Sequence, residues 1–470
     1  MKKILAVALG IIALLTAQAG AHAGGQAKVL KEHQGRWLGD MTLSDGRVLK
    51  IGAELLTRAD GSAWASFTCP TQDAYDVPVK RITESPQGVE LDFSIATMKL
   101  TWTGQHFDAL YQQNGQPLKL TLHKVAQFPR RAREQTPKGP FPYREQSLAI
   151  ASRDGVTLGA TLTIPNGKVR PNLAVLVAGS GPSARDGGVA GHQVLAVVAD
   201  HLARQGIAVL RYDKRGIARS TGNFELHTVD DLADDLHAVL RTLRSRKQFA
   251  RVGVVGFSEG PGIAAAVAAR DRAAIDFVVS LAGVGVSGLE LLLLQDRIYA
   301  ADKGATAAEA ERLMAYVRQF YQTVIEQPES GPRIAALRKV FQELSQEDQD
   351  LVRKRQMDKG TLSLEWAAQP FVRASLLEDP PAHWRAVRAP VLVLNGSLDH
   401  QVPAEENVAG ILAALQAGGN RQVESAILPG LNHLFQTAGT GAEEEYVALP
   451  ETITPMVLER IAAFVAKQRP

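Results

Sequence analysis

Residues 251–269 read RVGVVGFSEGPGIAAAVAA and join a strand pattern to a helix pattern. Residues 251–256 form an apolar run typical of a strand buried on both faces, and residues 263–269 favour a helix. Between them, Gly256-Phe257-Ser258-Glu259-Gly260 has the spacing of a sharp strand-to-helix turn that exposes its central serine. The glycines are needed because side chains two positions from the serine would clash in such a turn. The stretch therefore predicts Ser258 as a nucleophile.

Buried runs and helical patterns alternate on both sides of this stretch. Strands that are buried on both faces and separated by helices build a parallel sheet with helices on either side. The predicted fold class is therefore α/β, with a doubly wound, mostly parallel sheet. The expected strands are residues 173–178, 207–212, 277–282, 390–394 and 423–428, and the expected helices are residues 192–204, 230–243, 404–417 and 453–467.

Two later segments supply the base and the orienting acid that a nucleophilic serine needs. Asp399 follows the expected strand at 390–394, and His433 follows the one at 423–428. Both therefore lie at the carboxyl edge of the sheet, where the sites of open parallel sheets form. The chain order Ser258, Asp399, His433 is that of a triad on such a sheet. His400 is a rival base, but it adjoins Asp399 and follows no later strand, so we predict His433.

Acyl transfer also needs an oxyanion hole, a set of donors that stabilise the negatively charged oxygen of the tetrahedral intermediate. One expected donor is the backbone N–H of Glu259, directly after the nucleophile. The other is expected from Ser180 in Gly179-Ser180-Gly181, because small residues let the backbone approach a substrate. The predicted substrate contacts are Gly181, Arg185 and Phe257.

Five segments together carry a resemblance to a known family: residues 178–187, 211–216 (RYDKRG), 256–260, 394–403 and 428–436. They resemble the α/β-hydrolase superfamily. More narrowly they are similar to exported bacterial serine esterases with an N-terminal β domain and a helical cap, related to the serine aminopeptidase and dienelactone hydrolase branches. The resemblance implies hydrolysis of a small-molecule carboxylic ester through the triad and an acyl-enzyme, with no cofactor and no metal. Phe257 and Pro261 depart from the family pattern, where His and Gly are common, but neither belongs to the triad.

Two other functions stay open. An aminopeptidase-like serine peptidase would use the same triad and would need an acidic pocket for the free amine of its substrate. A non-catalytic binding protein on a hydrolase scaffold is the third hypothesis, and the joint presence of all three triad residues argues against it. The acidic residues within 230–235 open an expected helix, where carboxylates favour the helix dipole, so they do not indicate a metal site.

The composition excludes several further classes of protein. The chain has 470 residues, of which 45% are hydrophobic and 21% charged, as in globular rather than disordered or coiled-coil proteins. Lys+Arg is 52 against Asp+Glu 49, a net charge of +3, and no basic patch indicates a nucleic-acid partner. The single cysteine, Cys69, cannot form an intramolecular disulfide or a Cys-rich zinc site. No pattern in the chain indicates an oligomeric state.

The first 23 residues have the pattern of a signal peptide. Lys2 and Lys3 precede an apolar run at residues 4–15, and Ala21-His22-Ala23 fits cleavage after Ala23. The run is short for a membrane span, so we expect cleavage rather than an uncleaved anchor. The mature protein is then expected in the periplasm or secreted, with no stable membrane anchor. A chain with one cysteine suits such an oxidising compartment.

The patterns divide the chain into six expected segments. Within the expected helical cap, residues 285–388, Leu289 and residues 291–294 form an apolar run that either lines a pocket or builds a core inside the cap. Asp213 and Arg215 are expected to pair in the loop after residues 207–212. The segments are residues 1–23 (signal peptide), 24–127 (antiparallel β domain), 128–144 (Pro-rich linker), 145–284 (first part of the α/β-hydrolase core), 285–388 (helical cap) and 389–470 (second part of the core).

Overall fold

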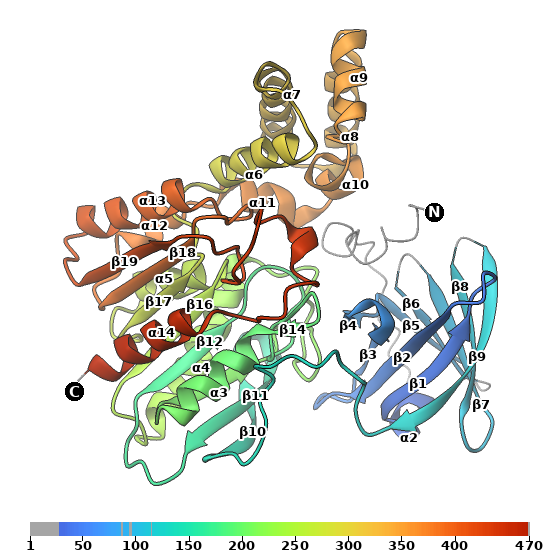
Figure 1. The fold of residues 1–470 in the computed structure, drawn as a ribbon, viewed down its shortest axis with the longest axis horizontal. Coiled ribbons are helices and arrows are strands. Elements are labelled where there is room, and N and C mark those ends of the chain that lie inside the picture. Colours follow the sequence, from blue (N-terminus) through green and yellow to red (C-terminus); the bar gives the residue numbers. More distant parts are fainter. Residues whose placement is uncertain (1–27, 86–87, 94–95, 114, 469–470) are drawn as a thin grey trace.

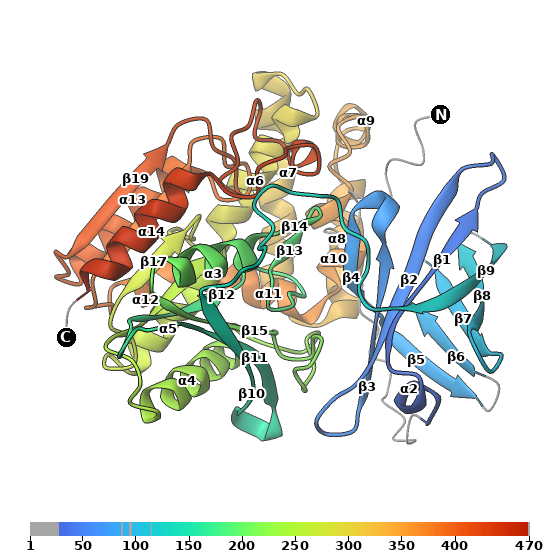
Figure 2. The same ribbon diagram turned by 60° about the horizontal axis from the view of Figure 1, so that its bottom comes forward.

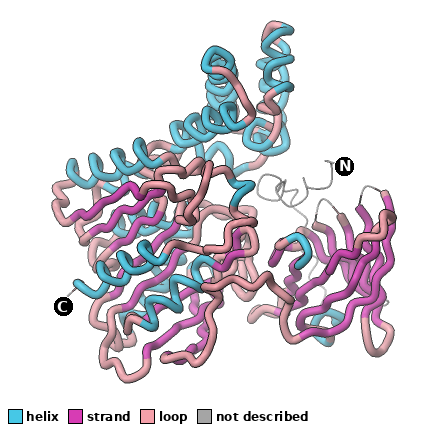
Figure 3. Tube along the Cα trace, in the orientation of Figure 1, coloured by secondary structure: helices cyan, strands magenta, loops and turns pink. Residues whose placement is uncertain are grey.

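The strands of the chain form two large sheets that come from separate stretches of sequence (Figure 1). The structure is a computed structural model, and it describes residues 28–85, 88–93, 96–113 and 115–468. A group of helices lies above the second sheet in the view of Figures 1 and 3. The predicted signal peptide, residues 1–23, lies outside the described residues and stays a prediction.

The first sheet, called here the N-terminal sheet, is curled and has nine strands in the order β4-β3-β2-β1-β9-β8-β7-β6-β5. The strands are β1 (Gly35–Thr42), β2 (Val48–Thr57), β3 (Ala63–Cys69), β4 (Ala74–Pro78), β5 (Arg81–Ser85), β6 (Gly88–Asp92), β7 (Thr97–Trp102), β8 (Phe107–Gln113) and β9 (Gln116–Val125), preceded by α2 (Lys28–Glu32). Each neighbouring pair is antiparallel. Val89 and Leu91 are buried and Glu90 between them is exposed, so the period of two builds a one-sided core. The predicted antiparallel β fold is confirmed.

The second sheet has eight strands in the order β10-β11-β15-β12-β16-β17-β18-β19. The strands are β10 (Tyr143–Ala151), β11 (Thr157–Pro165), β12 (Leu173–Val177), β15 (Ala208–Tyr212), β16 (Val252–Phe257), β17 (Val278–Leu281), β18 (Val391–Gly396) and β19 (Val423–Leu428). The six strands from β15 to β19 in this order are parallel, as predicted. The hairpin of β10 and β11 is antiparallel and was not predicted. Its first strand is mostly exposed, so it lacks the continuous apolar run of a central strand.

Helices cover both faces of this sheet and complete what we call the α/β unit. On one face, α4 (Val229–Ser245), α5 (Gly260–Arg270) and α13 (Ala404–Ala417) share a hydrophobic core with the strands. On the other, α3 (Val194–Arg204) and α14 (Pro455–Lys467) pack in a second core. The doubly wound arrangement predicted from the sequence is confirmed.

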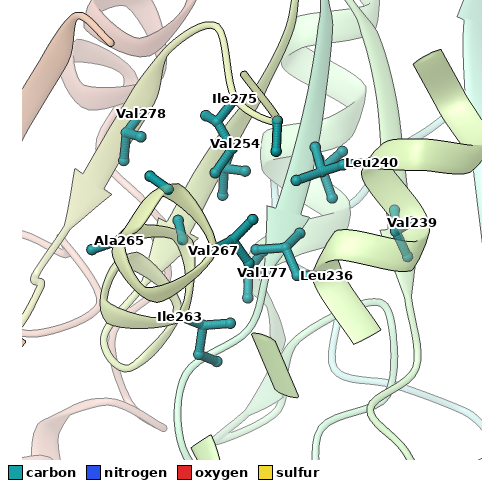
Figure 4. Close-up of a cluster of buried hydrophobic side chains, with 14 of the residues drawn as sticks. Val177, Leu236, Val239, Leu240, Val254, Ile263, Ala265, Val267, Ile275 and Val278 are labelled. Carbon is teal, nitrogen blue, oxygen red and sulfur yellow. The ribbon is translucent and has the colours of Figure 1, made fainter. Parts of the chain in front are cut away.

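Figure 4 shows part of the first core. Leu236 and Leu240 of α4 point toward Val254 of β16, and Val267 of α5 lies beside them. The four side chains are buried because α4 and α5 pack against the same face of the sheet. This packing fixes the start of α5, and with it the turn that carries Ser258.

Residues 288–377 form a helical cap between β17 and β18, with a hydrophobic core of its own. Its helices are α6 (Gly288–Asp302), α7 (Ala307–Glu326), α8 (Ser330–Gln342), α9 (Gln346–Lys354), α10 (Leu364–Ala367) and α11 (Pro370–Leu377). The Gly288 N–H donates to the Glu378 carbonyl oxygen at 2.9 Å, so the two ends of the cap lie next to each other. Leu289, Leu292 and Leu293 pack against the cap core, which favours the second of the two roles predicted for this leucine run.

The cap ends earlier than the predicted residue 388. The helix α12 (Pro380–Trp384) packs against α5 and α13 of the α/β unit. Trp384 and Val387 are fully buried in the core of that unit. A short helix has the same sequence pattern in a cap and on a sheet, which is why the boundary was misplaced.

Residues 126–142 connect the two sheets and contain no helix or strand (Figure 2). Their arginines bridge the two units. Arg131 pairs with Asp73 of the N-terminal sheet at 2.9 Å. The buried Arg133 donates to the carbonyl oxygens of Val447, at 3.0 Å, and Leu449 in the α/β unit. Among the described helices, none is both long and apolar enough to cross a bilayer.

Candidate active site

The turn around Ser258 joins β16 to α5 with a strained backbone. Ser258 has a φ of 58°, a left-handed conformation that residues with a side chain seldom adopt. A Cβ atom on Gly256 would lie 2.4 Å from the Pro261 nitrogen, and one on Gly260 would lie 2.4 Å from the Val177 carbonyl oxygen. Only glycine fits at these two positions. The turn therefore presents Ser258 at the carboxyl end of its strand.

Asp399 and His433 meet in the loops that follow β18 and β19. The Asp399 Oδ2 lies 2.8 Å from His433 Nδ1. Its Oδ1 accepts the backbone N–H groups of Gln401 and Val402 at 2.9 and 2.8 Å. Both side chains are buried, with 0% of Asp399 and 3% of His433 exposed. The fixed carboxylate selects the imidazole tautomer with a proton on Nδ1, which leaves Nε2 to act as a base.

Ser258 and His433 line one cavity of about 1540 Å³. Its walls come from the N-terminal sheet, the α/β unit and the cap. A cavity of this size exceeds what a small acyl group needs, and it is well above the range typical of small-ligand pockets. The aromatic lining residues include Trp64 and Tyr75 from the N-terminal sheet, Phe224 and Phe257 from the α/β unit, and Trp366 and Phe371 from the cap.

Phe257, predicted to shape the pocket wall, lies in this lining and contacts the predicted base. Its ring centroid is 4.9 Å from that of the His433 imidazole. The ring itself is 8% exposed. Phe257 therefore both bounds the cavity and packs against the imidazole.

The loop after β12 lies directly against the nucleophile. A Cβ atom on Gly179 would lie 2.9 Å from the Ser258 Cβ, so the backbone approaches the serine more closely than a larger residue allows. Ser180, Gly181 and Glu259 all line the cavity. The structure thus brings both predicted oxyanion donors and the predicted contact Gly181 to the side of Ser258.

Lys214 links these two donor segments, and the sequence analysis did not single it out. Its Nζ donates to the Gly179 carbonyl oxygen at 2.6 Å and to Glu259 Oε2 at 2.8 Å. The Lys214 side chain is only 4% exposed. Burial would raise the pKa of Glu259, but the Lys214 ammonium outweighs it and keeps that pKa below its usual range. The sequence held a signal for Lys214, because this residue lies in the RYDKRG segment that carries the family resemblance.

Arg185, a predicted substrate contact, forms an ion pair with a neighbouring loop and does not line the cavity. Its guanidinium contacts Asp213 with Nε at 3.0 Å and Nη2 at 2.5 Å, and it donates to Thr161 Oγ1 at 2.9 Å. This pair also replaces the predicted one between Asp213 and Arg215. Arg215 instead forms two hydrogen bonds of 2.8 Å with Asp235 on α4.

The rival base and the acidic helix start have partners of their own. His400 Nδ1 lies 3.1 Å from Asp302 of the cap, away from the triad carboxylate. Thr228 and Asp231 form a capping box at the start of α4. Asp235, another of these acidic residues, is buried against Arg215. Within the described part of the chain, no three His, Cys, Asp or Glu side chains are grouped to hold a metal ion.

A second buried histidine supports the loop that carries His433. His192 Nδ1 lies 3.0 Å from the Thr452 hydroxyl and its Nε2 lies 2.9 Å from the Tyr446 carbonyl oxygen. The side-chain Nε2 of Gln436, three residues after His433, lies 3.0 Å from the same ring nitrogen and ties His192 to the loop of His433. Burial lowers the pKa of His192 to about 4. Sequence reasoning missed this residue because its partners lie far along the chain.

Comparison with known families gives one match. A family model described as serine aminopeptidase, S33, matches residues 187–437, which is more than half of the chain. The matched range includes Ser258, Asp399 and His433.

One curated relative and two solved structures illustrate the likeness. Esterase EstD of Thermotoga maritima is 23% identical over 329 residues, covering 70% of this chain and 69% of EstD. Est1E of Butyrivibrio proteoclasticus, solved with ferulic acid bound, has a TM-score of 0.41 and 19% identity over 68% of this chain and 98% of its own. A puromycin-hydrolyzing peptidase of Mycobacterium tuberculosis has a TM-score of 0.44 and 15% identity over 92% of this chain and 53% of its own.

Proposed function

The chain belongs to the serine aminopeptidase, S33 family, and from this premise we propose that it hydrolyses carboxylic esters with Ser258 as the nucleophile. One observation carries the proposal: a left-handed Ser258 lines the same cavity as a His433 whose Nδ1 is bound to the buried Asp399. The relationship to an enzyme named an esterase, EstD, supports ester rather than amide substrates. Alkoxide is also an easier leaving group than an amine anion.

The mechanism follows from the positions of these groups. Ser258 Oγ attacks the ester carbonyl carbon while its proton passes to His433 Nε2, and the carbonyl π electrons become the oxyanion. Backbone N–H groups of Ser180 and Glu259 are the proposed donors to that oxyanion. The proton on His433 then passes to the departing alcohol oxygen, which leaves an acyl-enzyme. A water molecule, deprotonated by His433, attacks the acyl-enzyme and releases the acid and the free serine.

The cavity argues for a bulky substrate. Its aromatic side chains come from three units of the fold, and Phe371 of α11 is 38% exposed at this wall. An acetyl ester would leave most of this apolar surface in contact with water, whereas a long-chain or aromatic ester would cover it. We therefore propose that kcat/KM increases from acetate to butyrate to octanoate esters.

A serine peptidase that trims free N-termini is the second candidate function, and two carboxylates favour it. Glu378 and Glu443 both line the cavity. Burial raises the pKa of each, and the Asp230 and Glu259 carboxylates raise that of Glu378 further. An ammonium group on the substrate would stabilise whichever of the two carboxylates it lay beside. Aminoacyl amides, tested beside the esters, decide between the two functions by their kcat/KM.

The direct test uses the mature protein, p-nitrophenyl acetate, butyrate and octanoate, and a fluorophosphonate probe. Wild type should hydrolyse the esters and be labelled at Ser258, and Ser258→Ala should lose both, with turnover lower by several orders of magnitude. Activity should persist in EDTA, since the proposed steps use no metal. Full activity of Ser258→Ala would end the proposal.

We further propose that the protein is exported. The support is the pattern of residues 1–23, with a basic start, a short apolar run and a cleavage pattern at Ala23. N-terminal sequencing of protein recovered outside the cytoplasm should begin at Gly24. Retention of Met1 in exported protein would contradict this.

A further inference from the structure

A buried arginine joins the N-terminal sheet to a loop of the α/β unit. Arg58, directly after β2, is 9% exposed. Its guanidinium donates to the carbonyl oxygens of Gly216 and, at 3.1 Å, of Ala218. The two acceptors are neutral carbonyls, and burial lowers the pKa of Arg58 to about 10. Both carbonyls belong to the short loop that follows β15.

This loop is closed by its own hydrogen bonds. The Ile217 N–H donates to the Lys214 carbonyl oxygen at 3.0 Å, and the Gly216 N–H donates to the Thr221 carbonyl oxygen at 2.8 Å. The Ser220 hydroxyl donates to the Asp213 carbonyl oxygen at 2.6 Å. A loop tied at so many points moves as one body. By holding Gly216 and Ala218, Arg58 therefore contributes to where Lys214 lies.

Lys214 contacts the two segments that supply the proposed oxyanion donors. Its Nζ reaches the carbonyl oxygen of Gly179, next to Ser180, and the carboxylate of Glu259, whose own N–H is the second donor. An ammonium between these partners sets their separation. Oxyanion stabilisation depends on donors held at a fixed position before the charge develops, so a change in this separation lowers the rate of the chemical step.

We propose that the N-terminal sheet positions the oxyanion hole, acting through Arg58, the loop of residues 213–221 and Lys214. Arg58 and Lys214 are positioning residues in this scheme, because neither is required to touch the reacting atoms. The inference rests on the proposed esterase function and adds a role for the N-terminal sheet in that reaction. The sheet is then part of the catalytic apparatus as well as a wall of the cavity.

Other contacts hold the N-terminal sheet in place when Arg58 is removed. Asp73 of that sheet pairs with Arg131, and Arg131 also donates to the Val447 carbonyl oxygen at 3.3 Å. Arg133 binds Val447 and Leu449 close by. These contacts lie in a different part of the interface from the loop that Arg58 holds. Substitution of Arg58 should therefore loosen the loop and leave the two units joined.

The test measures an inhibitor that depends on the oxyanion hole. A trifluoromethyl ketone is attacked by Ser258 Oγ at its carbonyl carbon. The Oγ proton passes to His433, and the carbonyl oxygen becomes an oxyanion that the same donors bind. Its inhibition constant is measured together with kcat and KM for p-nitrophenyl butyrate. The variants are Arg58→Met, Arg58→Lys, Lys214→Met and the double variant, with Arg47→Met in the β1–β2 turn as the control.

Arg58→Met should lower kcat about tenfold and weaken the ketone by a similar factor, with KM unchanged. Lys214→Met should lower kcat about 100-fold, near the effect of removing one oxyanion donor. The double variant should match Lys214→Met, because residues acting in series are not additive. Arg58→Lys keeps the positive charge and can reach one carbonyl oxygen, so it should recover part of the loss in kcat. If Arg58→Met does not fold, Arg58→Lys is compared with wild type instead. Arg47→Met should behave as wild type.

Unchanged ketone affinity in the Arg58 variants would overturn the inference, as would additive losses or an effect on KM alone. Failure of the proposed function is distinguishable from this outcome. In that case wild type itself shows no ester hydrolysis and no labelling of Ser258. If wild type is active and sensitive to the ketone while the Arg58 variants bind it equally well, the inference alone is wrong.

Discussion

The ring of Phe257 lies against the imidazole of His433, with their centroids 4.9 Å apart and their planes tilted by 51°. This contact restricts the movement of the imidazole. Aromatic pairs of this kind contribute about 0.5–1.5 kcal/mol beyond the area that they bury. Phe257, the residue before Ser258, therefore also helps to hold His433 in place.

Replacing Phe257 should affect the chemical step. We expect Phe257→Leu to lower kcat by about 2- to 10-fold, because the imidazole loses its aromatic neighbour. The matched variant is Phe371→Leu, an aromatic cavity residue of the cap, which should raise KM for octanoate esters and leave kcat near that of wild type. Steady-state kinetics on octanoate and acetate esters distinguish an effect on kcat from an effect on KM in the two variants. Equal effects of both variants on kcat would contradict the role given to Phe257.

Asp399→Asn should lower kcat by about 10³–10⁴-fold with the fold intact. An asparagine can still accept the N–H groups of Gln401 and Val402, but its amide does not select the tautomer that protonates His433 Nδ1. The control is Asp302→Asn, which replaces the carboxylate partner of His400, the rival base, by an amide. That variant should keep wild-type turnover. A large loss in Asp302→Asn and none in Asp399→Asn would reverse the assignment of the base.

Asp296 in the cap should make stability depend on pH. It is buried and accepts hydrogen bonds from the hydroxyls of Tyr321 and, at 3.0 Å, Thr361. Burial raises the pKa of Asp296 from 3.8 to about 6. The folded state then binds this proton more tightly than the unfolded state, so this contribution to stability is lost as pH rises from about 4 to about 6.

Asp296→Asn should remove that part of the pH dependence. Asparagine keeps one acceptor and one donor for the two hydroxyls and has no charge to bury. Thermal melting across pH 4–8 should show a smaller decrease in the variant than in wild type. Asp302→Asn, on the same helix but at the surface, serves as the control. Parallel melting curves for Asp296→Asn and wild type would show that the carboxyl group is not responsible.

His192 should act in the opposite direction. Its pKa is lowered from 6.5 to about 4 by burial, so the unfolded state binds the extra proton between these values. Stability is therefore lost as pH falls from about 6.5 to about 4. We expect His192→Gln to cost about 1–3 kcal/mol of unfolding free energy at pH 8, since buried partners lose a hydrogen bond. Urea unfolding should also show less acid sensitivity in the variant, and an unchanged acid response would contradict the assignment.

The sheet and the triad positions followed from local patterns. Ser258, Asp399 and His433 each follow a predicted strand, and the carboxyl ends of parallel strands share one edge. Their placement at one edge of the sheet could therefore be predicted without knowing any contact. The same holds for the alternating strands of the N-terminal sheet.

The remaining features depend on contacts between distant residues. Arg185 pairs with Asp213, 28 positions later, and Lys214 reaches Glu259 across 45. A charged residue has several possible partners nearby in the sequence, and spacing does not distinguish between them. For this reason the sequence predicted the wrong pair, Asp213 with Arg215. Trp384 was assigned to the cap because its helix is too short to reveal which surface it packs on. The exposed strand β10 lacked the apolar run that identifies a central strand.

The hydrogen bond between Gly288 and Glu378 has a consequence for how this protein can change over evolutionary time. The chain leaves the sheet after β17 and returns to β18, the strand that pairs with β17. Gly288 and Glu378, at the two ends of the cap, are in contact. The entropy of closing such a loop grows only slowly with its length. Insertions, deletions or whole replacements of the intervening helices therefore leave the register of the two strands, and the machinery at their ends, undisturbed. Substrate preference in this lineage can diverge by exchange of one segment while the chemistry is inherited unchanged.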